Sequence, residues 1–144
     1  MVKKEKKAEK KKDLMLKVGK RKRAIARATI KPGTGKIRVN SIPIEEIGNE
    51  TFFSLISEPL LLIGDEWKKY DYDVNVRGGG VVGQAEAVRQ SIAKGLADAL
   101  GERVKKIFIE YNRNLLAYDP RRTEPHKPPH SSWGPRRYKQ RSKR

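Results

Sequence analysis

The charge of this 144-residue chain is distributed unevenly, and the distribution limits which part of it can fold around a core. Residues 1–40 hold 16 Lys and Arg against 3 Asp and Glu, residues 119–144 hold 9 against 2, and residues 41–118 hold 9 against 12. Cationic stretches with few apolar side chains cannot bury enough surface to offset the entropy of ordering. We therefore predict a basic N-terminal extension over 1–15, one globular domain over 16–118 and an extended basic tail over 119–144.

The tail combines its cations with prolines, which favour extended backbone over helix. Its only large apolar side chains are Trp133 and Tyr138, so we expect it to become ordered against a partner. An extended cationic ribbon of this kind suits a crevice lined with phosphates. The prolines of the tail are Pro120, Pro125, Pro128, Pro129 and Pro135.

The net charge of +17 exceeds what solubility requires and indicates a polyanionic partner. The chain has no cysteine, which excludes disulfides, thiolate nucleophiles and cysteine zinc sites, and its 2 histidines make a poor metal site. The apolar runs 14–16 and 60–63 are too short for a signal peptide and for a membrane span. We expect a protein without metal or cofactor that is not secreted and does not enter a membrane.

Alternation of apolar and polar residues predicts three strands. Ala24–Ile30 and Lys36–Asn40 are rich in β-branched residues, with residues 31–35 as the turn between them. Tyr70–Arg77 alternates most clearly, as expected of a strand with one buried face.

Helical spacing of apolar residues predicts three helices after the first two strands. Phe52, Leu55 and Ile56 have the spacing of one helix face, and Pro59 either ends that helix or begins another turn. Residues 85–100 form the strongest helical stripe, which Gly101 can end. Residues 104–111 favour another helix, with a strand as the weaker alternative. The predicted fold class is α+β, a small sheet with helices packed on one face.

Gly78-Gly79-Gly80-Val81-Val82-Gly83 satisfies the G-x-G-x-x-G pattern of dinucleotide-binding turns between a strand and a helix. That function also requires a second parallel strand that ends in an acidic residue about 20 positions on. Glu102 has this spacing but follows a predicted helix. We therefore favour a tight turn that lets the helix pack closely, with nucleotide binding as the alternative.

The sequence lacks the common catalytic motifs, including H-E-x-x-H, G-x-S-x-G and a P-loop lysine. Asp71 and Asp73 share one face of a predicted strand, where paired carboxylates can do acid–base chemistry but are more often only solvated. His126 and His130 lie in the Pro-rich tail, where contact with RNA is favoured over catalysis. We predict that the chain is not an enzyme.

The cations best suited to binding a polyanion run directly into a predicted strand. Gly19-Lys20-Arg21-Lys22-Arg23 leads into Ala24, and Arg27 continues the run. A cation anchored on a strand loses less freedom on binding than one on a free tail. Lys36 and Arg38 on the adjoining strand could extend the patch.

Five segments follow one another in a characteristic order: Gly19–Arg27 (opening motif), Gly33–Asn40 (first hairpin), Gly83–Ile92 (helix), Asp119–Pro128 (start of the tail) and Ser142–Arg144 (last residues). Together they resemble a known family, the universal ninth protein of the small ribosomal subunit in its archaeal and eukaryotic form. The resemblance covers nearly the whole chain. The departures are small: Ser41 stands where a glycine is common and Arg23 where a small polar residue is common.

The resemblance implies a sheet with a left-handed βαβ crossover, an exception to the usual handedness. It also implies a cytoplasmic place in the head of the small subunit, beside other head proteins. Proteins of this family bind 16S-type ribosomal RNA there and send their tail toward the peptidyl-site tRNA. It implies no small-molecule substrate.

Two sets of contact residues follow from the cationic patch and the resemblance together. The candidate tRNA contacts are Arg141, Lys143 and Arg144. The candidate ribosomal RNA contacts are Lys20, Arg21, Lys22, Arg23, Arg27, Arg38, Arg121, Arg122, Lys127, Arg136 and Arg137.

The main alternative function is that of a DNA-architectural or general nucleic-acid binder, because phosphate neutralisation alone does not distinguish RNA from DNA.

Overall fold

The computed structural model describes residues 14–123 and residue 125. Within them, a mixed sheet of 5 strands has the order β1-β2-β5-β3-β4. The division into an N-terminal extension, a domain and a tail, with boundaries after residues 15 and 118, remains a prediction. The strands are β1 (Met15–Arg21), β2 (Ala24–Pro32), β3 (Ile37–Val39), β4 (Ile42–Pro43) and β5 (Tyr70–Arg77). The helices are α2 (Glu50–Ile63), α3 (Val81–Leu100) and α4 (Glu102–Tyr111), with short 3₁₀ helices at Ile44–Glu46, Gly64–Lys69 and Arg113–Leu115.

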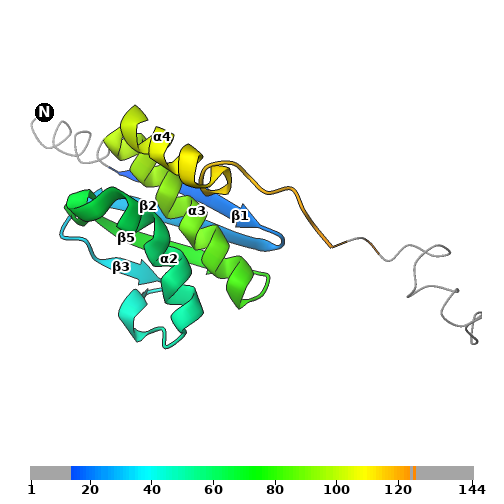
Figure 1. Ribbon diagram of the computed structural model, residues 1–144. Coiled ribbons are helices and arrows are strands. Elements are labelled where there is room, and N and C mark those ends of the chain that lie inside the picture. Colours follow the sequence, from blue (N-terminus) through cyan, green and yellow to red (C-terminus); the bar gives the residue numbers. More distant parts are fainter. Residues whose placement is uncertain (1–13, 124, 126–144) are drawn as a thin grey trace, which may run out of the picture.

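The helices cover one face of the sheet (Figure 1). α3 lies against β1 and β2, α2 packs beside α3, and α4 packs on α3 from outside. The predicted α+β class and the placement of the helices on one face are confirmed. No described helix is long and apolar enough to span a bilayer.

β2 and β3 are not neighbours, which corrects the expected hairpin around residues 31–35. β5 lies between them, antiparallel to β2 and parallel to β3. The connecting loop passes over the start of β5, where the Asp71 carboxylate accepts hydrogen bonds from the Thr34 and Lys36 N–H groups at 2.8 and 2.9 Å. The loop therefore joins two strands through β5 instead of folding one onto the other.

The first hairpin of the structure is β1–β2, and the sequence prediction missed β1. Its alternation is inverted: Leu16 and Val18 point to the uncovered face, where they are 60% and 36% exposed. Lys17 and Arg21 point to the helix side, where they form ion pairs with Asp98 and Glu86. A strand whose charged residues lie under a helix does not show the usual pattern of a buried apolar face.

The crossover from β3 through α2 to β5 is left-handed. β3 and β5 are parallel neighbours. In Figure 1 both run to the right, α2 lies in front of the sheet, and β5 lies above β3. This is the hand opposite to that of most parallel crossovers, as the family resemblance implied.

Pro59 does not end α2, because the helix continues through it to Ile63. Asn49 caps the other end, its side chain accepting a hydrogen bond from the Phe52 N–H at 3.0 Å. The helices predicted over 85–100 and 104–111 are confirmed as α3 and α4.

The β3–β4 turn holds Ser41 in a backbone conformation that glycine adopts most readily. Asn40 and Ser41 have φ angles of +51° and +71°, a region that favours glycine. The Asn40 side chain holds the turn, since it accepts from the Val76 N–H at 2.8 Å and donates to the Val76 carbonyl at 3.2 Å.

The glycine-rich segment before α3 is a tight turn, as predicted. Gly78 and Gly79 have φ angles of +79° and +69°. A Cβ on Gly79 would lie 3.1 Å from the Ala24 Cβ, so the turn can press against β2 only without side chains. No described strand follows α3, and the dinucleotide-binding arrangement is therefore absent from residues 14–123.

Small residues let α3 lie against the backbone of the sheet. A Cβ added to Gly19 of β1 would lie 2.0 Å from the carbonyl oxygen of Ala87 in α3. A Cβ added to Gly95 of α3 would lie 1.7 Å from Cδ1 of Ile30. The β2 side chains beneath the helix are also small and fully buried: Ala24, Ala26 and Ala28.

Replacing Gly19 by Ala should lower the free energy of unfolding by about 1–3 kcal/mol, because the new methyl would force β1 away from α3. The matched control is Gly83→Ala, where the added Cβ would have its nearest neighbour at 3.8 Å. Removing a glycine from a helix should leave stability equal or raise it by up to about 1 kcal/mol. Urea unfolding followed by circular dichroism measures both. Equal losses would contradict the close contact at Gly19.

Candidate nucleic-acid interface

The uncovered face of the sheet, called here the open face, carries cations from four strands. Strand register places Lys20, Ile25 and Arg77 in one row across β1, β2 and β5. The next exposed row contains Val18, Arg27 and Asn75. Lys31 lies further along β2, and Arg38 lies on β3 beside Asp73. Lys20, Arg27 and Arg38 were predicted contacts, and the structure brings them to one face.

Arg77 and Lys31 belong to the same face but were not among the predicted contacts. Period-two alternation already placed Arg77 on the polar side of its strand with Asp71, Asp73 and Asn75. The missing information was which strand lies next to β5. Because β5 pairs with β2, Arg77 lies opposite Ile25 of β2. Lys20 of β1 lies opposite Ile25 on its other side, so Ile25 separates the two cations.

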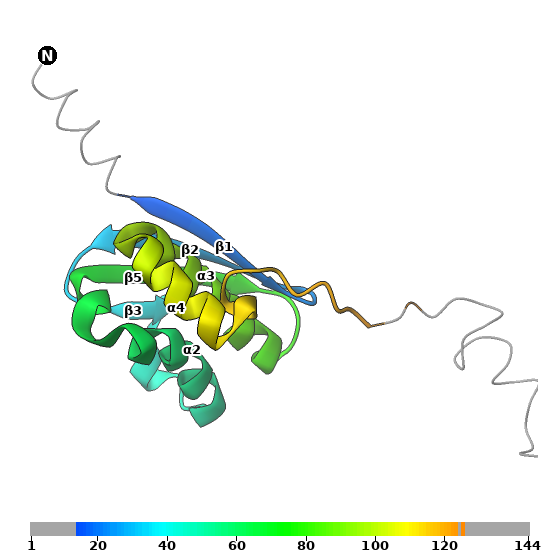
Figure 2. The same ribbon diagram turned by 45° about the horizontal axis from the view of Figure 1, so that its top comes forward.

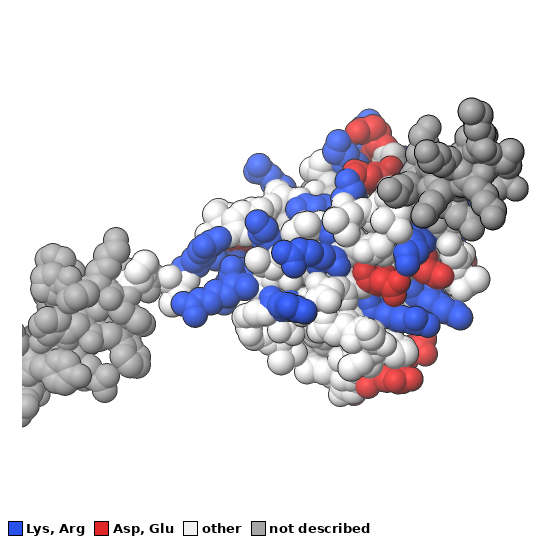
Figure 3. Space-filling view, turned by 180° about the vertical axis from the view of Figure 1, so that it is seen from behind, with Lys and Arg blue, Asp and Glu red and all other residues white. Residues whose placement is uncertain are grey.

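The two ends of the open face differ in how far acidic side chains neutralise their cations. Lys31 lies 3.5 Å from Asp73, so charge is partly compensated near the β2–β3 loop. At the other end Lys20, Arg27 and Arg77 form no ion pair with any described residue, nor do Lys22 and Arg23 in the β1–β2 turn. Figure 3, which looks at this face, shows Lys and Arg gathered toward the end where the C-terminal segment leaves.

Arg21 is not on the open face, although sequence placed it in one patch with Lys20 and Lys22. Its side chain is 15% exposed and forms ion pairs with Glu86 of α3 at 2.5 Å and with Asp119 at 2.9 Å. Both carboxylates neutralise this guanidinium where it lies. Arg21 therefore joins the hairpin, α3 and the C-terminal segment.

The C-terminal segment is held beside the β1–β2 turn (Figure 2). Gln90, which is buried in α3, accepts from the Lys20 N–H at 2.8 Å and donates to the Ala117 carbonyl at 2.5 Å. The backbone of Asp119 also forms an isolated parallel β-bridge with the backbone of Arg21. This anchoring brings the base of the tail to the cationic end of the open face.

Arg121 and Arg122 differ in how their charge is used. Arg121 contacts both carboxylate oxygens of Asp119 at 2.7–3.1 Å. Arg122 donates to the Tyr118 hydroxyl at 2.9 and 3.1 Å and has no acidic partner among the described residues. Arg122 is therefore the more available of the two predicted contacts.

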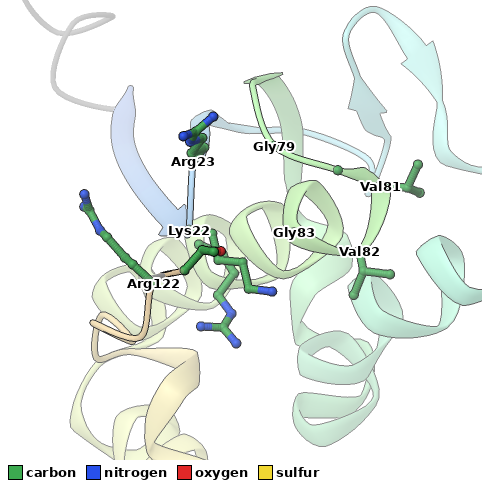
Figure 4. Close-up of a pocket in the computed structure, with 10 residues that line it drawn as sticks. Lys22, Arg23, Gly79, Val81, Val82, Gly83 and Arg122 are labelled. Carbon is green, nitrogen blue, oxygen red and sulfur yellow. The ribbon is translucent and has the colours of Figure 1, made fainter. Parts of the chain in front are cut away.

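A hollow of about 750 Å³ lies between the β1–β2 turn and the start of α3 (Figure 4). Cations from two segments line it, and none of its lining residues is acidic. Gly80, the N-cap residue of α3, provides no side-chain cap, and the first turn of the helix has no acidic residue, which leaves the helix terminus attractive to anions. Its lining comprises Arg21, Lys22, Arg23, Gly79, Gly80, Val81, Val82, Gly83, Arg122 and Thr123.

The remaining predicted contacts lie outside the described residues. These are Lys127, Arg136, Arg137, Arg141, Lys143 and Arg144, together with His126 and His130.

The carboxylates of β5 have structural partners. Hydrogen bonds from the Lys36 and Thr34 N–H groups lower the pKa of Asp71, which keeps it an ionised acceptor. Asp73 lies beside Lys31. A lowered pKa makes Asp71 unsuited to donating a proton near neutral pH. The described residues also contain no group of three or more potential metal-ligating side chains.

A face with several cations that have no acidic partner among the described residues is typical of proteins that lie against a polyanion. Comparison with known sequences names the family. The family model described as Ribosomal protein S9/S16 matches residues 19–144, and the chain belongs to this family. Members are structural proteins of the ribosome, not enzymes.

Two curated relatives illustrate the similarity, and both are archaeal. "Small ribosomal subunit protein uS9" of Methanococcus maripaludis (strain C7) is 45% identical over 128 residues, covering 88% of this chain and 96% of the relative. The protein of the same name from Desulfurococcus amylolyticus is 52% identical over 117 residues, covering 81% and 80%. The family suggested by the sequence motifs is confirmed.

The Asp119 carboxyl should titrate with a pKa of about 2, below its ordinary 3.8, because hydrogen bonds from the Arg121 side chain and N–H favour its ionised form. Arg121→Gln should raise this pKa toward 3.8, while the control Arg122→Gln should not, since Arg122 contacts Tyr118 instead. Carboxyl NMR measured against pH tests both.

A depressed pKa also sets the pH range in which Asp119 contributes stability. The contribution is complete above about pH 4, and it is lost as the pH falls through about 2. An unchanged pKa in Arg121→Gln would contradict the assignment of Arg121 as the main cause.

Proposed function

We propose that this chain is held in the small ribosomal subunit, in the cytoplasm, by contacts between its open face and ribosomal RNA. The observation that carries this proposal is the set of cations without acidic partners on rigid strands. Lys20, Arg27 and Arg77 cannot neutralise each other and have no internal counter-charge among the described residues. A polyanion supplies the missing charge.

The open face is suited to RNA backbone more than to base stacking. By the alternation along β5, Tyr70 and Tyr72 lie on the covered face of the sheet. The described strands present no aromatic side chain on the open face. Contacts from Lys and Arg to phosphates position a protein without reading sequence directly. The exposed Leu16, Val18 and Ile25 between the cations would lie against sugars. We infer recognition of the shape and charge of folded RNA.

The C-terminal tail extends this interface. Its base is anchored beside the β1–β2 turn by Arg21 and Gln90. Residues 124–144 would span at most about 75 Å if fully extended. We propose that Arg141, Lys143 and Arg144 contact phosphates of the peptidyl-site tRNA, which rests on the family resemblance. Neighbouring proteins of the subunit head complete the expected partners.

A general DNA-binding function is the alternative with the same electrostatics. Co-sedimentation of the chain with small subunits at moderate salt distinguishes the two, because a DNA-architectural protein would not remain with the subunit.

Replacing Lys20, Arg27 and Arg77 together by Ala should weaken binding of the full chain to small-subunit ribosomal RNA. If each side chain neutralises one phosphate, the slope of log affinity against log salt should become less steep by about 2 to 3. Fluorescence anisotropy over a series of KCl concentrations measures the slope.

The control removes the same charge from the helix side, with Lys105, Lys106 and Arg113 replaced by Ala. All three side chains are exposed, on α4 and in the following 3₁₀ helix. Its slope should match that of the unmodified chain. Equal slopes for the two triple variants would contradict the assignment of the open face.

Deleting Lys143 and Arg144 should spare assembly but speed the dissociation of peptidyl-site tRNA from programmed subunits. Each charge-assisted contact is worth about 1.5–3 kcal/mol before the entropy of ordering the tail is subtracted. The difference should shrink as salt rises. Identical dissociation rates at low salt, with normal protein occupancy, would leave only the ribosomal RNA role.

A further inference from the structure

The hollow beside the β1–β2 turn combines two kinds of surface that a phosphate contact alone does not explain. Lys22, Arg23 and Arg122 supply positive charge without an acidic lining residue. Val81 and Val82 at the start of α3 are 55% and 54% exposed in the same lining. Phosphate binding would use the cations and leave both valines in water.

The glycine turn leaves the centre of the hollow free of side chains. Gly78 and Gly79 cannot readily be replaced, because their φ angles are positive and their missing Cβ atoms would meet Arg23 and Ala24 at 2.7 and 3.1 Å. A Cβ on Gly80 would meet nothing within 4 Å, so the space above this peptide is open. Bare peptide groups and an apolar side chain together form a surface on which a flat ring can lie.

The labelled side chains take up opposite sides of this space. In Figure 4, Val81 and Val82 lie on one side of the glycine turn, and Lys22, Arg23 and Arg122 lie on the other. The positive charge and the apolar surface are thus separated across the hollow. A ligand that fits must carry an anionic group joined to a flat, largely apolar one.

We propose that the hollow takes one unstacked nucleotide of RNA, with its base against Val82 and the glycine turn and its phosphate between Lys22 and Arg122. Nucleotides splayed out of a loop or bulge present this combination of charge and flat surface. An apolar protein segment would leave three cations without counter-charge. The inference rests on the proposed function, because it places one nucleotide of the same ribosomal RNA.

Val82→Ser tests the base contact without changing charge. The full-length variant should bind small-subunit ribosomal RNA about fivefold more weakly, the lower end of the range for a base contact, with an unchanged salt slope. Lys22→Ala should instead make the slope less steep by about 1. The matched control is Ile109→Ser on α4, the same kind of change at a side chain that is 51% exposed. Circular dichroism verifies that each variant is folded.

Cross-linking gives a second readout that locates the nucleotide. Ribosomal RNA containing 4-thiouridine is irradiated with the bound chain and digested with trypsin. Gly78–Arg89 is released as one peptide, because no Lys or Arg lies inside it. A nucleotide adduct on this peptide that is reduced in Val82→Ser supports the proposal.

Equal affinities of Val82→Ser and Ile109→Ser, with the unmodified chain binding normally, would overturn the nucleotide proposal and leave the open-face function intact. Failure of the unmodified chain to bind ribosomal RNA at all would overturn both.

Discussion

The contact between α3 and the β1–β2 hairpin is the constraint on which the rest of this structure depends. Where Gly19 and the alanines of β2 face α3, only hydrogen atoms and methyl groups lie between the helix and the strand backbones. Dispersion contacts fall off steeply with separation, so this close approach gives tight packing from small residues. It also commits one face of the sheet to the helices and leaves the opposite face uncovered.

Cations in the domain consequently serve two different purposes. On the helix side, Lys17 and Arg21 are neutralised by Asp98 and Glu86 of α3. Arg21 has Asp119 as a second partner, which brings the base of the tail to the hairpin turn. On the open face, Lys20, Arg27 and Arg77 keep their charge for an external partner. Adjacent residues of one short strand, Lys20 and Arg21, thus take up opposite roles because strand geometry points them to opposite faces.

Interface geometry also depends on topology. The loop after β2 crosses the start of β5, held there by Asp71, and the left-handed crossover then inserts β5 between β2 and β3. Arg77 therefore joins a row with Lys20, although more than 50 residues separate them in sequence. The same insertion places the glycine turn after β5 beside the β1–β2 turn, which creates the hollow at the start of α3.

The sequence by itself determined the fold class, β5, the helices α3 and α4, and the family, because these depend on local periodicity and on residues that stand close together in the chain. It also located most of the cations, since charge is visible without a structure. Only the tertiary structure decided which of them face outward. β1 was missed because its charged residues lie beneath a helix, a pattern that local alternation assigns to solvent. Contacts between distant segments show that Glu86 and Asp119 neutralise Arg21 and that Arg77 belongs to the open face, and no local pattern contains these contacts.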